Sequence, residues 1–82
     1  MKLKKNIAIS ESGFVFDPSS GDSFTMNPIG VEILTLLKEG KGQDDIYNHV
    51  LNKYEVDRDT FENNYFDFIN MLRQFNLIET TS

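Results

Sequence analysis

Segment 14–30 combines the residues of a turn with the signals that begin a helix a few residues later. Two short apolar stretches, 14–17 and 23–26, flank a loop rich in Asp, Pro, Ser and Gly, a pattern typical of a β-hairpin. Asn27 then offers an N-cap side chain, and Pro28 lies in the first helical turn, where a missing N–H is tolerated. This order predicts a hairpin whose last strand has no further strand beside it, so one sheet edge stays open.

Three strands are expected before the first helix, over 6–10, 14–17 and 23–26. Alternation in the first strand places Ile7 and Ile9 on one face. In the second strand it places Phe14 and Phe16 on one face and Val15 on the other. A three-stranded sheet with one apolar face needs a partner layer to be stable.

Three helices are expected to form that layer. They cover 28–38, 43–54, and a third segment that is capped by Asp57 or Asp59 and ends near Phe75. The inward-facing residues are expected to be Ile29, Ile33, Leu36 and Leu37, then Ile46, Val50, Leu51 and Tyr54, then Phe61, Tyr65, Phe68, Ile69, Leu72 and Phe75. Strands first and helices afterwards predict an α+β fold, with Leu77-Ile78 as a short extended tail.

The length of 82 residues predicts a single domain, 1–82, with a core over about 7–79. A chain of this size buries only roughly 60–65 % of its unfolded surface, although seven Phe and three Tyr add large apolar side chains. The absence of cysteine excludes disulfides and thiolate metal sites. No signal-peptide or membrane-spanning pattern is present, so we expect a soluble, cytoplasmic protein with no membrane partner.

Charge is unevenly distributed along the chain. Three lysines near the amino terminus, Lys2, Lys4 and Lys5, are interpreted as a solubilising start. Segment 43–67 carries only Lys53 and Arg58 against seven acids, which are Asp44, Asp45, Glu55, Asp57, Asp59, Glu62 and Asp67. Because nucleic-acid binders present a basic face, this balance predicts no nucleic-acid partner.

No pattern of catalytic or metal-binding residues is found. His49 is the only histidine, and the adjacent Asp44 and Asp45 point about 100° apart on a helix, where they suit the first turn. Segment 40–42 lacks the spacing of a phosphate loop, and 17–22 lacks the glycine and glutamate positions of a calcium loop. We therefore expect a protein that is not an enzyme and has no cofactor and no metal.

The third predicted helix has more apolar surface than one core-facing stripe needs. Phe66 lies off the stripe and Met71 widens it, while the expected edge strand 23–26 carries no Lys or Pro that would protect it. Together these features predict a groove between an open strand edge and an aromatic helix. A peptide could bind there by strand addition.

The ordered motifs resemble those of the PqqD-like proteins, which are precursor-peptide recognition elements in pathways of ribosomally made, post-translationally modified peptides. The resemblance spans about residues 7–79. It rests on the Asp17-Pro18 turn, Asn27-x-x-Gly30-x-x-Ile33-Leu34-x-Leu36, Gly40-Lys41-Gly42, Ile46, Tyr54-x-Val56-Asp57 and Phe68-Ile69-x-x-Leu72-x-x-x-x-Leu77-Ile78.

The resemblance implies a winged-helix-like fold and a non-catalytic peptide-binding chaperone. Such a protein binds the leader segment of a precursor peptide as an added strand and presents it to a maturation enzyme, often a radical SAM protein. The peptide-binding residues would be Phe24, Thr25, Met26, Phe61, Asn64, Tyr65, Phe68 and Leu72. The sequence departs from the family at Asn64, where an acid is expected, and at Asn76, where a glycine is usual.

Two other functions fit the same order of elements. One is a winged-helix DNA-binding protein, against which the acidic second and third helices count. The other is a protein-interaction or self-associating subunit that uses the same open strand edge. We expect the chain to be a monomer or a weak dimer.

Overall fold

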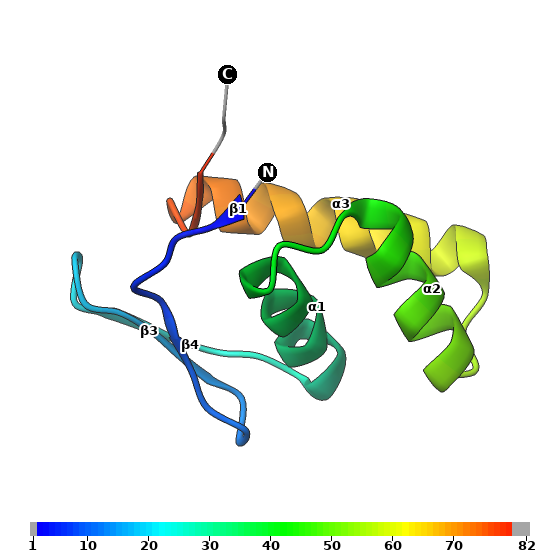
Figure 1. Ribbon diagram of the computed structural model, residues 1–82, viewed down its shortest axis with the longest axis horizontal. Coiled ribbons are helices and arrows are strands. Elements are labelled where there is room, and N and C mark those ends of the chain that lie inside the picture. The colour runs from blue at the N-terminus through cyan, green and yellow to red at the C-terminus, as the bar shows by residue number, and fades with distance from the viewer. Residues whose placement is uncertain (1, 80–82) are drawn as a thin grey trace.

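The computed structural model describes residues 2–79 and shows a small sheet packed beside three helices (Figure 1). Its elements are β1 (Lys2–Leu3), β2 (Ala8–Ile9), β3 (Phe14–Asp17), β4 (Asp22–Thr25), α1 (Pro28–Lys38), α2 (Gln43–Lys53), α3 (Arg58–Gln74) and β5 (Ile78–Glu79). The predicted α+β fold, a three-stranded antiparallel sheet followed by three helices, is confirmed.

The three-stranded sheet has the order β2-β3-β4, so β4 lies at an edge. The register pairs Ala8 with Phe16 on one side of β3, and Phe14 with Thr25 on the other. β2 is much shorter than the predicted strand 6–10, and β4 begins and ends one residue before the predicted 23–26. The backbone at Met26 still bonds to Gly13, so the pairing continues one step beyond the assigned strand.

A second sheet joins the two ends of the chain. β1 pairs antiparallel with β5, with Lys2 opposite Glu79 and Leu3 opposite Ile78. Leu3 and Ile78 are both buried in the core. This sheet is not among the predicted strands, because the only predicted feature at either end was the extended tail.

Helix ends follow the predicted signals. The Asn27 side chain accepts a hydrogen bond from the Gly30 N–H at 2.7 Å, and Asp57, not Asp59, caps α3. Gly40 adopts φ 85° after α1, as its position predicts. Asn76 adopts φ 60°, in the left-handed region that asparagine tolerates better than most residues.

The core differs from the predicted stripes in a few positions. Leu34 and Tyr47 are buried although neither was predicted to face inward. The predicted core residues Ile29, Leu36, Leu51, Tyr54 and Phe68 are only half-buried. Phe75 is 48 % exposed because it lies at the C-cap of α3, where its ring packs against the half-buried Phe24 of the edge strand.

The sheet faces the core through Val15, which is fully buried on β3. Phe14 and Phe16 lie on the opposite, outer face and are 58 % and 43 % exposed. Asp17 is buried at the end of the strand, where its carboxylate accepts hydrogen bonds from the N–H and the hydroxyl of Ser19. These bonds lower the pKa of Asp17 below its ordinary value.

Candidate functional site

At the open edge of β4, the backbone amides of two residues, Ser23 and Thr25, point away from β3. Met26 N–H donates to the Gly13 carbonyl at 2.8 Å, so the Met26 backbone points toward β3. Because backbone direction alternates along an antiparallel pair, Phe24 also bonds toward β3, and the Ser23 and Thr25 amides point to the free side. The predicted edge, Phe24 to Met26, therefore offers Thr25 as its outward backbone group, and Ser23 lies one step earlier.

The side chains of Phe24 and Met26 face inward and connect β4 to the helices. The Phe24 ring packs against Phe75 with centroids 4.9 Å apart and the planes tilted by 56°. Gly30 marks the other junction, because a Cβ there would lie 3.4 Å from Met26 Cβ and 3.3 Å from Phe68 Cε1. A larger residue than glycine would crowd this contact between the edge strand and α3.

A pocket of about 510 Å³ continues from that junction along α1 and α3. Its walls are mainly apolar and aromatic, with a few amide, hydroxyl and carboxylate groups. The lining residues are Asn27, Ile29, Ile33, Val56, Thr60, Phe61, Asn64, Tyr65, Asp67, Phe68 and Met71. We call this pocket and the adjoining β4 edge the groove.

The predicted helical residues fall in different parts of the groove. Phe61, Asn64, Tyr65 and Phe68 line it together, and Asn64 is exposed while Phe61 and Tyr65 are almost wholly buried. Leu72 is fully buried in the core and does not line the pocket.

The two apolar residues that widen the stripe of the third predicted helix also differ in position. Met71 lines the pocket, and Phe66 is exposed and lies outside it. The lining contributed by Asn27, Ile29 and Ile33 from α1 and by Val56 before α3 was not predicted as part of the site. The family motifs contain Asn27, Ile33 and Val56, and these motifs were the signal that pointed to the three positions.

Two buried tyrosines pack against each other, and Tyr65 is part of the groove wall while Tyr47 lies outside the lining. Tyr47 and Tyr65 stack edge to face with centroids 5.1 Å apart. Neither hydroxyl has a hydrogen-bond partner among the described residues. Burial is the main cause that raises the pKa of each phenol above its ordinary value, so both side chains stay neutral.

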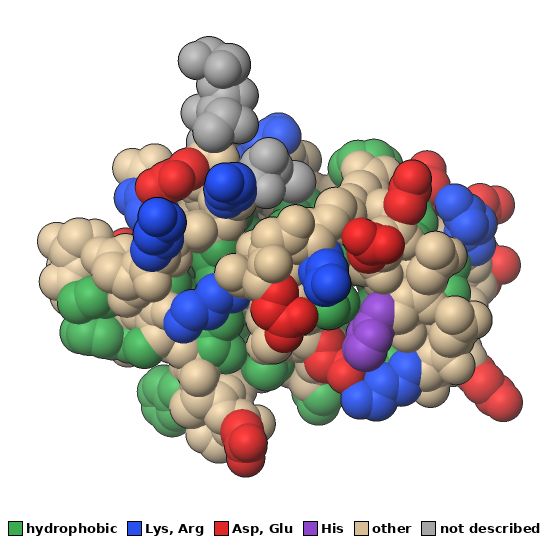
Figure 2. Space-filling model, viewed as in Figure 1, with side chains coloured by type: hydrophobic (Ala, Val, Ile, Leu, Met, Phe, Trp, Pro, Cys, Tyr) green, Lys and Arg blue, Asp and Glu red, His purple; other side chains and the backbone are tan. Residues whose placement is uncertain are grey.

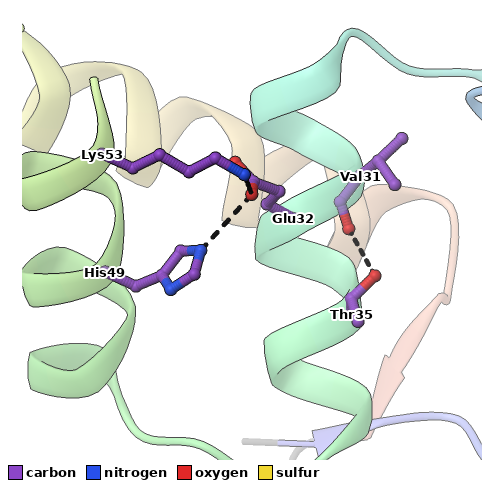
Figure 3. A network of polar contacts seen from close by, with 5 residues as sticks. All are labelled: Val31, Glu32, Thr35, His49 and Lys53. Carbon is purple, nitrogen blue, oxygen red and sulfur yellow. Dashed lines mark hydrogen bonds and ion pairs between the residues drawn. The ribbon is translucent and has the colours of Figure 1, made fainter. Parts of the chain in front are cut away.

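A polar network fixes α1 against α2 on the side away from the β4 edge (Figure 3). Glu32 accepts hydrogen bonds from Lys53 at 2.5 Å and from the His49 ring at 3.3 Å. Burial by itself would raise the pKa of Glu32, but hydrogen bonds from Lys53, Tyr54 and His49 outweigh it and lower the pKa to about 2. The same helix carries a Thr35 hydroxyl bonded back to the Val31 carbonyl at 2.8 Å. The network thus holds in place the helix that forms one wall of the pocket.

No group of three or more His, Asp or Glu side chains within residues 2–79 lies close enough to hold a metal ion. None of the helices in that range has the length and apolar content needed to cross a membrane. The groove combines apolar walls, a free strand edge and a few polar groups, one of which is the Asp67 carboxylate, and this chemistry suits a binding surface.

Comparisons with known proteins give one family match and two similar solved structures. The family model for PqqD, described as coenzyme PQQ synthesis protein D, matches residues 13–78. A solved structure of TbiB1 in complex with the TbiA(beta) leader peptide is similar over 100 % of this chain and 99 % of that chain, with 28 % identity and a TM-score of 0.86. No curated protein matches the sequence.

A second solved structure, lasso peptide synthetase B1 complexed with the leader peptide, has 20 % identity and a TM-score of 0.76. It covers 98 % of this chain and 96 % of that chain. The described chain therefore shares its fold with both structures over nearly their full lengths.

Proposed function

The chain belongs to the PqqD family, and from this premise we propose that it binds the leader segment of a ribosomally made precursor peptide. The observation that carries the proposal is the free β4 edge, with the Ser23 and Thr25 amides directed outward, beside an apolar groove. TbiB1, which has the same fold, was solved in complex with a leader peptide.

The leader binds as an added strand. Its backbone exchanges hydrogen bonds with Ser23 and Thr25, each worth roughly 0.5–1.5 kcal/mol net. Its apolar side chains pack against Phe24, Met26 and Phe68, and one of them enters the pocket. Phe61, Asn64 and Tyr65 form the helical wall, and Leu72 supports that wall from the core. A few backbone bonds and one apolar anchor together give a moderate affinity.

The protein acts without catalysis, as a chaperone that presents the bound leader to a maturation enzyme. The groove offers apolar walls beside a free strand edge, which supports a binding role. We propose an enzyme of the radical SAM class as one partner of this kind.

Replacing Thr25 with proline tests strand addition. Thr25→Pro removes the outward N–H and leaves the inward bonds of Phe24 and Met26 to β3 in place, whereas Thr25→Val keeps the N–H. Fluorescence anisotropy would use labelled leaders of precursors encoded beside this gene, with the TbiA(beta) leader as a reference.

We expect Thr25→Val to bind normally and Thr25→Pro to lose at least tenfold in affinity. Circular dichroism would check that both variants are folded. Equal affinity of the two variants would contradict strand addition, and duplex DNA binding by the wild type would favour the winged-helix alternative.

Self-association is a second candidate, because Phe14 and Phe16 leave the outer face of the sheet apolar and exposed. Each phenylalanine offers at most roughly 150–250 Å² of surface, and both are already partly covered. That area is well below the roughly 800 Å² per partner of a stable interface, so it supports a weak dimer at most. Sedimentation velocity over a wide concentration range, repeated with Phe16→Ser, would detect such a dimer.

A further inference from the structure

One charged side chain lines the pocket, and it is Asp67 on α3. The other polar lining residues are the neutral Asn27, Asn64 and Thr60, and Tyr65 is kept neutral by its raised pKa. No lysine or arginine of the described chain lines the pocket. The pocket is therefore apolar with a single negative charge.

The cations Lys53 of α2 and Arg58 of α3 have other partners. Lys53 is paired with Glu32, and the Arg58 guanidinium lies over the Tyr47 ring at 5.5 Å from its centroid. Within the described residues no salt bridge involves Asp67. Figure 2 shows several further acidic side chains on the surface around α2 and the beginning of α3. No ion pair within the described residues therefore compensates the charge of Asp67.

Building on the proposed function, we propose that Asp67 is a specificity-determining residue that selects leaders with a Lys or Arg beside the apolar side chain in the pocket. The direction of β4 indicates on which side of the leader's paired segment this cation lies. β4 runs from Asp22 to Thr25 and on to Asn27 at the pocket. An added strand in the more favourable antiparallel direction therefore reaches the pocket with the residues that precede its paired segment.

The same charge disfavours leaders with an acid at that position. An exposed ion pair contributes modestly, so the expected preference for Lys over Gln is about two- to fivefold. A Glu at that position should bind more weakly than Gln, so the difference between Lys and Glu should exceed the difference between Lys and Gln. Such a preference should shrink at high salt, because exposed charges are screened.

Selection from a phage-displayed library of random peptides of about twelve residues tests the inference without a known leader. The library would be panned on the wild type, Asp67→Asn, Asp67→Lys and the matched control Asp44→Asn, an exposed acid on α2 outside the groove. We expect the wild type and Asp44→Asn to enrich Lys or Arg just before or after a shared apolar position. Asp67→Asn should lose this bias, and Asp67→Lys should enrich Asp or Glu there.

Lys, Gln and Glu versions of one enriched peptide would then be compared by fluorescence anisotropy at low and high salt. The inference is overturned, with the proposed function intact, if peptides with apolar anchors are enriched and all three versions bind equally. It is also overturned if Asp67→Lys enriches the same peptides as the wild type. Failure to enrich any peptide that competes at the β4 edge would overturn the proposed function as well.

Discussion

Glu32 should make the stability of this domain depend on pH in the acidic range. Its carboxylate has a pKa of about 2 in the folded chain against an ordinary value of 4.5. Because the folded value is the lower one, the stabilisation is fully present above about pH 4.5 and is lost as the pH falls toward about 2. At about 1.4 kcal/mol per pH unit, the upper bound is about 3 kcal/mol.

Solvent reduces that bound. The Glu32 side chain is only 20 % exposed, but that of its partner Lys53 is 56 % exposed, so screening weakens the pair. We therefore expect Glu32→Gln to lower the free energy of unfolding at neutral pH by about 1–2 kcal/mol. The gap between wild type and variant should close between about pH 4.5 and 2.

Urea denaturation followed by circular dichroism at a series of pH values measures both quantities. Glu55→Gln, which removes an exposed carboxylate from the loop before α3, is the matched control and should leave the pH profile of the wild type unchanged. Parallel profiles for wild type and Glu32→Gln across the acidic range would refute the assignment of the pH dependence to Glu32.

Three pairs of substitutions, each a test with its control, examine other parts of the structure. Gly13→Ala should lower stability by roughly 1–3 kcal/mol in thermal unfolding, because Gly13 has φ 100° and an added Cβ would lie 2.5 Å from the Met26 carbonyl oxygen. Gly21→Ala, at φ 77° with open space around it, should cost less, and an equal cost would contradict the steric argument. Asn76→Ala should cost about 1 kcal/mol in the same assay while Asn76→Gly does not, and a loss with both would show that φ 60° is not the cause. Phe68→Ala should weaken leader binding about tenfold and the exposed Phe66→Ala should not, so a reversed order in anisotropy would place the peptide elsewhere.

Helix positions could be predicted from the sequence because their signals are local. Asn27, Pro28 and Asp57 mark helix starts through side-chain and backbone chemistry that needs no distant partner. Alternation likewise separated Val15 from Phe14 in β3. It could not tell which face is buried, since both faces of that strand are apolar.

The second sheet and half of the groove could not be predicted in this way. β1 and β5 have two residues each and pair across nearly the whole chain, so neither has a periodic signal of its own. Asn27, Val56 and Asp67 line the pocket because of the way in which α1 packs against α3. Periodicity defines the face of each helix, but it does not give the angle at which two helices meet.

Amide hydrogen exchange by NMR, with and without a bound leader, tests strand addition at β4 most directly. In the free protein we expect the Phe24 and Met26 amides, which bond to β3, to be protected, and the Ser23 and Thr25 amides to exchange freely. Leader binding should protect Ser23 and Thr25 selectively. Binding that leaves these two amides unprotected, with protection appearing on α2 or on the outer face of the sheet, would contradict the account.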